Sequence, residues 1–168
     1  MSTAKPSSMG RQTFVDTFGG LYERSPWVAE RVFDAGLDAR HDVPGHLHEA
    51  FRKTVLTAGR LTQLALLRAH PQLACGQSSL TGDSLSEQQA AGLQNCSDEE
   101  LRAFAELNAK YRKRFGFPFI VAVRGKHRKQ ILAQFRERLQ AQPDVEFKTA
   151  LEQVCLIGKH RLAERYHG

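Results

Sequence analysis

The stretch SDEELRAFAELNAKYRKRFG (97–116) carries signals for both ends of one helix. Ser97 is followed three residues later by Glu100, the spacing of a capping box in which each side chain binds the other residue's main-chain amide. Basic residues fill the last turns, where they face the negative end of the helix dipole, and Gly116 is a typical stop. Apolar side chains recur between these ends, at Leu101, Phe104, Ala105 and Tyr111. The stretch therefore predicts one amphipathic α-helix.

Helical spacing recurs on both sides of this stretch. Further helices are predicted within 23–36, 44–59, 61–70, 84–93, 126–142 and 143–166. A chain of 168 residues suits one domain with one sizeable core. We expect an all-α, single-domain bundle of about seven or eight helices over residues 1–168, in which residues 1–10 form a flexible tail.

Two of these helices carry start signals of their own. Ser25 is the expected N-cap of the helix within 23–36, with Pro26 at the first helical position and Gly36 as the stop. Ser84 and Glu87 lie three residues apart and fit a second capping box at the start of 84–93. Local capping chemistry thus predicts where both helices begin.

The stretch FGFPFIVAVRG (115–125) breaks the helical pattern. Its apolar run has the length of a strand and is bounded by Gly116 and Gly125. A lone strand has no partner in so helical a chain, so we expect a buried extended segment near 117–124. Core packing alone explains such a run. Alternatively, its main-chain amides, free of helix bonds, bind a ligand, and the planar fork of Arg124 fits a carboxylate.

The net charge of +6 admits several kinds of partner. The densest basic stretches, KYRKR (110–114) and RGKHRK (124–129), are not interleaved with the aromatic residues of a base-stacking surface. Most of these charges are expected on solvated helix faces, and no nucleic-acid partner is predicted.

Membrane, disulfide and metal signals are weak as well. No apolar run approaches the ~18–20 residues of a membrane span, and the first ten residues do not read as a signal peptide. Cys75, Cys96 and Cys155 form no CxxC pair, which favours the cytoplasm. The histidines of HLH (46–48) do not share a helix face, so no metal site is predicted.

The stretch LRAHPQLACG (67–76) places His70 where an apolar helical run ends, directly before Pro71. One interpretation is that the imidazole only interacts with the carbonyls of the helix C-terminus, which favours its cationic form. The other is that Pro71 fixes the exit path and holds the ring at the edge of a cleft, where histidine exchanges protons near neutral pH.

Ser84, Glu87 and Gln88 lie at i, i+3 and i+4, so a helix places them on one face. A capping box would occupy the first two. The alternative is a polar face that offers a hydroxyl, a carboxylate and an amide to a compact, nitrogen-rich ligand.

Four motifs together resemble one family. SPW (25–27), AHPQLA (69–74), SLSEQQAAGL (84–93) and FGFPFIVAVRG (115–125) are similar, in this order, to motifs of the OHCU decarboxylases, named for 2-oxo-4-hydroxy-4-carboxy-5-ureidoimidazoline. The likeness runs from about Phe14 to Tyr166. It implies an all-helical, often dimeric enzyme that converts OHCU to (S)-allantoin and CO2 in urate degradation, without a metal or an organic cofactor.

The resemblance also implies the site residues. His70 and Glu87 are the expected catalytic residues. The expected substrate-binding residues are Pro71, Ser84, Gln88, Ile120, Val121, Ala122, Val123 and Arg124. A homodimer in the cytoplasm follows from the same likeness. From the residues alone, a different class of protein stays open, a non-enzymatic helical binding or scaffold protein for anionic partners.

Overall fold

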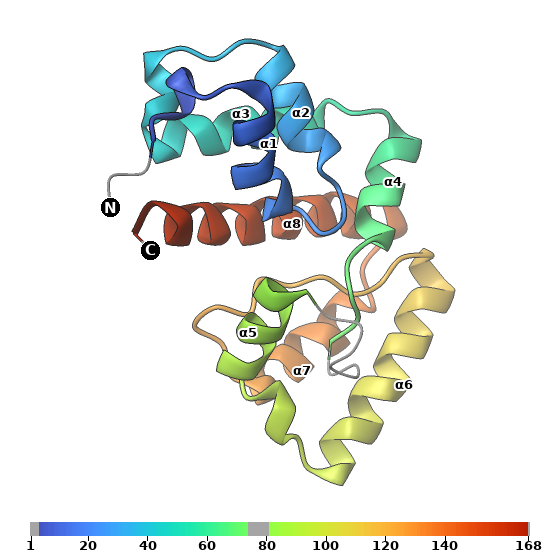
Figure 1. The fold of residues 1–168 in the computed structure, drawn as a ribbon. Coiled ribbons are helices and arrows are strands. Elements are labelled where there is room, and N and C mark those ends of the chain that lie inside the picture. The colour runs from blue at the N-terminus through green and yellow to red at the C-terminus, as the bar shows by residue number, and fades with distance from the viewer. Residues whose placement is uncertain (1–3, 74–80, 168) are drawn as a thin grey trace. The chain divides into compact units, whose positions relative to one another are not determined.

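The computed structural model describes residues 4–73 and 81–167. These ranges contain eight α-helices and no strand, which confirms the all-α prediction (Figure 1). The helices are α1 (Arg11–Phe18), α2 (Trp27–Asp34), α3 (Pro44–Leu56), α4 (Arg60–Arg68), α5 (Gly82–Ala90), α6 (Asp98–Phe115), α7 (Arg128–Arg138) and α8 (Pro143–His167). Short 3-10 helices are η1 (Pro6–Ser8), η2 (Gly19–Leu21), η3 (Ala39–Asp42) and η5 (Leu93–Asn95).

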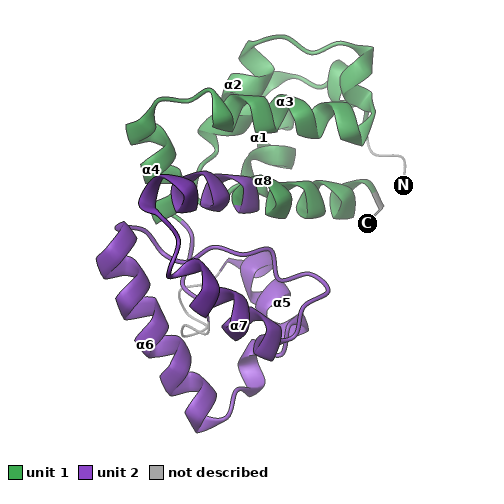
Figure 2. Ribbon diagram, turned by 180° about the vertical axis from the view of Figure 1, so that it is seen from behind, with its two compact units in different colours: residues 1–69, 154–168 green, residues 70–153 purple. Residues whose placement is uncertain are grey.

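The chain divides into two compact units (Figure 2). Unit 1 consists of Met1–Ala69 and Val154–Gly168, and unit 2 of His70–Gln153. Helix α8 contributes to both units. Every residue expected at the site falls within unit 2, and the single domain over 1–168 stays a prediction.

Unit 1 has an aromatic core. Phe14 of α1 lies 4.9 Å from Phe18 and 6.1 Å from Phe51 of α3, measured between ring centroids. Tyr22 stacks on Phe51 at 5.9 Å. A Cβ at position 158 of α8 would lie 2.9 Å from the Tyr22 ring, so this close approach of helix and ring needs Gly158.

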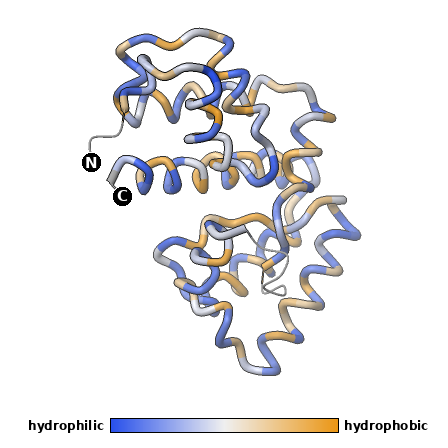
Figure 3. Tube along the Cα trace, in the orientation of Figure 1, coloured by the Kyte–Doolittle hydropathy of each residue, from blue (hydrophilic) through white to orange (hydrophobic). Residues whose placement is uncertain are grey.

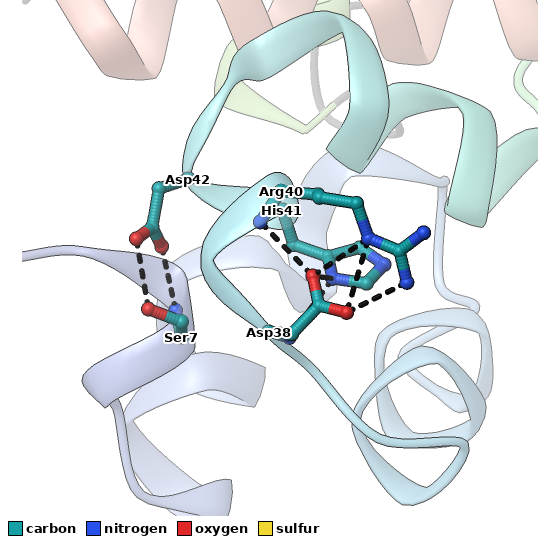
Figure 4. Close-up of polar contacts among 5 residues, drawn as sticks. All are labelled: Ser7, Asp38, Arg40, His41 and Asp42. Atoms are coloured by element: carbon teal, nitrogen blue, oxygen red, sulfur yellow. Dashed lines mark hydrogen bonds and ion pairs between the residues drawn. The ribbon is translucent and has the colours of Figure 1, made fainter.

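Polar contacts fix the N-terminal part of unit 1 (Figure 4). The main-chain N–H and the hydroxyl of Ser7 each donate to the Asp42 carboxylate at 2.8 Å. Asp38 caps η3 by accepting from the Arg40 amide at 2.9 Å, and the side chains of Arg40 and His41 complete the cluster. Hydrogen bonds from Arg40 lower the pKa of Asp38 to about 2. The segment expected to be a flexible tail thus contains η1, which Asp42 binds.

The start of α2 differs from the prediction. The helix begins at Trp27, with Pro26 as its N-cap residue. The Ser25 hydroxyl donates to the Glu23 carbonyl at 2.8 Å, so the predicted Ser25 cap is wrong, because the hydroxyl has this nearer partner. Gly36 follows the end of α2 with a φ of +98°, which confirms the predicted stop.

Helix α6 organises unit 2. Its capping box is confirmed, since the Ser97 amide donates to Glu100 at 3.0 Å and the Glu100 amide to Ser97 Oγ at 3.1 Å. Gly116 ends the helix with a φ of +79°. The hydropathy colours alternate along α6, as an amphipathic helix requires (Figure 3). Its buried residues are Phe104, Leu107, Asn108 and Tyr111, whereas Leu101 and Ala105, expected on the core face, are exposed.

The Tyr111 ring is the centre of a second aromatic cluster. Four other rings lie 4.5–5.8 Å from it between centroids, those of Phe115, Phe117, Phe119 and Phe135. Two of them, Phe117 and Phe119, belong to the segment after α6. This segment runs without helix or strand to a turn at Arg124 and Gly125. Ile120, Val121, Ala122 and Val123 are all buried, so the expected buried segment outside the helices is confirmed.

Candidate active site

His70 lies in a bend two residues beyond the last residue of α4. The predicted helix within 61–70 is therefore too long at its end. A proline disfavours helical backbone at the residue before it, so the helix ends ahead of His70. His70 is only 8% exposed, although it stands outside any helix.

Two amide side chains hold the stretch His70–Leu73, which we call the strap. Gln88 Nε2 of α5 donates to the Gln72 carbonyl at 3.4 Å. Asn108 Nδ2 of α6 donates to the Leu73 carbonyl at 3.1 Å. The strap thus receives hydrogen bonds from two helices directly after Pro71, and one of the donors is a predicted site residue.

The N-cap of helix α5 lies three residues before the predicted one. Thr81 is the N-cap, and its side chain accepts from the Ser84 amide at 3.3 Å. The predicted Ser84–Glu87 capping box is wrong, because the earlier hydroxyl takes the cap and places Ser84 inside the first turn. Ser84 and Gln88 are each 4% exposed, and Glu87 is half-buried. The predicted shared face of α5 therefore points inward at two of its three polar positions.

The segment Ile120–Val123 is held by side chains from two further helices. Arg138 Nη1 of α7 donates to the Ile120 carbonyl at 2.6 Å. The Ala122 amide donates to Gln153 Oε1 of α8 at 2.9 Å. Across the described ranges, no hydrogen bond joins the amides of Val121 and Val123 to a protein acceptor. Buried amides without an acceptor are rare in folded chains, so these two are candidates for a ligand.

Arg124 differs from the four residues before it. It is exposed, and it opens the turn in which the Lys126 amide donates to the Val123 carbonyl at 2.9 Å. The segment therefore joins four buried residues to one solvent-facing guanidinium at its end.

The geometry agrees with a comparison of the whole sequence with known families. Residues 7–163 match the family described as OHCU decarboxylase. The chain belongs to the OHCU decarboxylase family. The 2-oxo-4-hydroxy-4-carboxy-5-ureidoimidazoline decarboxylase of Haloferax volcanii is 42% identical over 154 residues, which cover 92% of this chain and 89% of that protein. The resemblance drawn from the four motifs is thus confirmed.

Solved structures of OHCU decarboxylases and related proteins share the fold. A crystal structure of (S)-allantoin synthase superposes with a TM-score of 0.76 and is 32% identical, covering 95% of this chain and 52% of that one. This chain thus spans about half the length of that synthase. A crystal structure of OHCU decarboxylase in the presence of (S)-allantoin has a TM-score of 0.70, covers 84% of this chain and 92% of that one, and at 24% identity supports the fold alone.

Three residues that hold the strap and the segment were not indicated by the motifs of the OHCU decarboxylase family. They are Asn108, Arg138 and Gln153. Asn108 alone left a local signal, a polar residue at a core position of an amphipathic helix. Cys75 and the end of the AHPQLA motif lie outside the described residues. In the described ranges, no cluster of three His, Cys, Asp or Glu residues could hold a metal ion. None of the described helices is long and apolar enough to cross a membrane.

Proposed function

We propose that the strap, the inner face of α5 and the segment 120–124 form the site at which this chain decarboxylates OHCU. The reaction is the one its family carries out, the carboxy-lyase step that produces (S)-allantoin in urate degradation. One observation carries the placement of the site. Gln88, on the buried face of α5, binds the strap two residues after His70, so two of the motifs meet in unit 2.

The substrate supplies its own electron sink. The carbon that bears the carboxylate and the hydroxyl adjoins a ring C=N bond. When the bond to the carboxylate breaks, CO2 leaves, the electron pair of that bond moves into the C=N unit, and the ring nitrogen takes up a proton, which gives a planar enol. A proton added to the neighbouring ring carbon, with loss of the hydroxyl proton, then gives allantoin. The protein has to orient the substrate, stabilise the moving charge and deliver the proton to one face.

Each residue has a proposed role in this chemistry. His70 is the acid/base group beside the hydroxyl and the carboxylate, since imidazole exchanges protons near neutral pH. Glu87 accepts hydrogen bonds from ring or ureido N–H groups and helps to move protons. Ser84 and Gln88 fix the orientation of the substrate, and Pro71 forms the wall beside the histidine ring.

The segment 120–124 is the proposed electrophilic side of the site. The buried amides of Val121 and Val123 donate to carbonyl or anionic oxygens of the substrate, while Ile120 and Ala122 bind the protein through Arg138 and Gln153. Arg124 reaches the substrate from the exposed end. A tight bond between this guanidinium and the departing carboxylate would stabilise the ground state, so its proposed contact is a weak one.

Circular dichroism tests the proposal directly. OHCU that decays unaided is protonated on either face of its planar intermediate and gives racemic allantoin without an optical signal. Purified protein mixed with freshly generated OHCU is expected to speed the reaction and to give the signal of the (S) enantiomer. Decay at the rate of the buffer, with a racemic product, would contradict the proposal and favour a non-enzymatic binding protein.

We also propose that the chain forms a homodimer in the cytoplasm. The dimer is supported by the family likeness, and the location by three cysteines too widely spaced in sequence for a CxxC pair. Light scattering coupled to size-exclusion chromatography should give twice the mass of the 18.9 kDa chain. A monomer at micromolar concentration would contradict the dimer.

A further inference from the structure

A buried ionic cluster joins helices α6, α7 and α8 in unit 2 and binds the segment 120–124 at Ile120. Glu146, in the first turn of α8, is 1% exposed. Its Oε1 accepts from the Tyr111 hydroxyl of α6 at 2.5 Å, from Arg138 Nε at 2.9 Å and from Arg138 Nη2 at 2.6 Å. Arg138, in the last turn of α7, is itself 8% exposed. One carboxylate oxygen thus holds a tyrosine and an arginine from different helices.

The other edge of the Arg138 guanidinium holds the segment. Nη1 donates to the Ile120 carbonyl, and Cζ lies 4.4 Å from the centroid of the Phe119 ring. Phe119 in turn stacks on Phe135 of α7 at 3.9 Å, with 11° between the ring planes. The Arg138 guanidinium therefore binds Glu146 through one edge and Ile120 through another, and its Cζ atom lies over the Phe119 ring.

Stability alone is a poor explanation for this cluster. A buried ion pair loses in desolvation much of what it gains in attraction, and apolar residues of similar volume often serve as well. Moreover, the Glu146 Oε2 atom is buried and has no hydrogen-bond partner among the described residues. What the cluster supplies is a fixed place for one carbonyl, because the charge-assisted fork sets both the distance and the direction of its donors.

The place of that carbonyl matters to its neighbours. Ile120 directly precedes Val121, whose buried amide has no protein acceptor in the described ranges. Burial, and the hydrogen bond to Glu146, raise the pKa of Tyr111 well above 10, so its phenol remains a donor at physiological pH. The hydrogen bonds among Tyr111, Glu146 and Arg138 therefore stay the same at physiological pH.

We propose that Arg138, held by Glu146 and Tyr111, is a positioning residue that fixes the main chain at Ile120 so that the amides of Val121 and Val123 meet the substrate in one register. This inference rests on the proposed function, since it assigns those amides to OHCU. It concerns the precision of the site, because Arg138 acts through the main chain and has no contact with substrate in this scheme.

The double variant Arg138→Met with Glu146→Leu tests the inference. It removes both charges together and keeps apolar volume, so no uncompensated charge stays buried. We expect cooperative melting like that of the parent, a loss of about 10²-fold in kcat, since small misplacements have costs of this size, and allantoin of lower enantiomeric purity. Hydrogen exchange should quicken in the peptide covering 117–124.

The matched control is Arg114→Met. It breaks an exposed hydrogen bond from this arginine to the Ala141 carbonyl (2.9 Å) elsewhere in unit 2, and it should change none of these readouts.

The outcomes separate this inference from the proposed function. If the parent protein does not speed OHCU decay, the proposed function fails first, and the inference falls with it. If the parent is active and the folded double variant keeps its kcat, enantiomeric purity and exchange rates, only the inference is overturned. Should the double variant not fold, Arg138→Lys decides. Lysine keeps the charge beside Glu146 and loses the fork, so kcat, purity and exchange like those of the parent overturn the inference, and their shift supports it.

Discussion

The strap and the segment 120–123 are both irregular, and they differ in that a charged side chain helps to hold the segment. Neutral amide groups of Gln88 and Asn108 hold the strap, at 3.4 and 3.1 Å. The buried Arg138 guanidinium holds the segment at Ile120, at 2.6 Å, in addition to the Gln153 amide at Ala122. Charge-assisted hydrogen bonds are shorter and roughly twice as strong as neutral ones. The strap, which carries the proposed proton transfer, is therefore held less rigidly than the segment, which carries the proposed oxygen binding.

This difference suits the two tasks. An acid/base group has to follow a proton from one atom to another, so some freedom of the strap is tolerable. Donors for a developing negative charge act best when they are already in place before the charge appears. Substitutions in the strap and on α5 should therefore lower the rate of proton transfer, whereas substitutions behind the segment should also loosen the stereochemistry.

The largest effect is expected for His70→Asn. Removal of an acid/base group typically costs ~10²–10⁴-fold in rate. The variant should keep its melting temperature, because His70 lies outside the helices. Its optical signal should fall toward that of the unaided, racemic reaction because unaided decay then competes with the slowed enzymatic reaction. Turnover at the parent rate with the same handedness would show that His70 only completes a helix end.

Glu87→Gln should come next. Because Thr81 caps α5, the loss of the Glu87 charge leaves the cap in place. We expect a large loss of kcat with little change in melting temperature. Thr81→Ala is the matched control, since it should lower the free energy of unfolding by about 0.5–2 kcal/mol and leave kcat close to that of the parent. Full activity of Glu87→Gln would remove Glu87 from the chemistry.

These two predictions start from residues that the motifs already indicated. The helix caps show where prediction from sequence succeeds and where it fails. Ser97 and Glu100 could be read correctly because their bonds span three residues, and Arg128 binds Glu100 without displacing them. Ser25 could not, because its hydroxyl binds the Glu23 carbonyl, and Ser84 could not, because Thr81 stands three residues ahead. A capping pattern therefore predicts a helix start only when no neighbouring group takes the place of the capping hydroxyl or binds it elsewhere.

The partners of the three supporting residues could not be predicted from local sequence. Asn108 binds a carbonyl 35 residues away, Arg138 one 18 residues away, and Gln153 an amide 31 residues away. Such pairs depend on how the helices pack, which spacing along the chain does not specify. The fold class and the family could therefore be predicted from sequence, whereas the long-range hydrogen bonds that hold the strap and the segment 120–123 could not.

Asn108→Leu tests how the strap is held. The change removes the hydrogen bond to the Leu73 carbonyl and keeps the side-chain volume. A neutral hydrogen bond contributes about 0.5–1.5 kcal/mol, so kcat/KM should fall by roughly 2–10-fold. Enantiomeric purity should hold, because the segment is untouched. Loss of purity in this variant would show that the strap, too, controls the face of protonation.

Arg124→Lys should have a smaller effect. The substitution keeps the charge at the exposed end of the segment and loses the planar fork that fits a carboxylate. Because solvent competes at this position, we expect kcat/KM to fall by less than about tenfold, with kcat nearly constant. A kcat/KM equal to that of the parent would take Arg124 out of the site.

The smallest effect on activity is expected at an ion pair that resembles that of Arg138 but is only half-buried, between Arg128 and Glu100. Arg128 Nε of α7 donates to both oxygens of Glu100, at 3.0 and 2.9 Å. Hydrogen bonds from the Ser97 amide and from Arg128 lower the pKa of Glu100 from its ordinary 4.5 to about 2. A lowered pKa stabilises the fold above the ordinary value, and this contribution is lost as the pH falls from 4.5 toward 2. Glu100→Gln should therefore melt at a lower temperature than the parent at pH 7, and the difference should shrink as the pH approaches 2, while kcat at pH 7 stays that of the parent. If kcat and enantiomeric purity fell instead, this half-buried ion pair would position the site as well as the buried one, and the contrast between the two ion pairs would be lost.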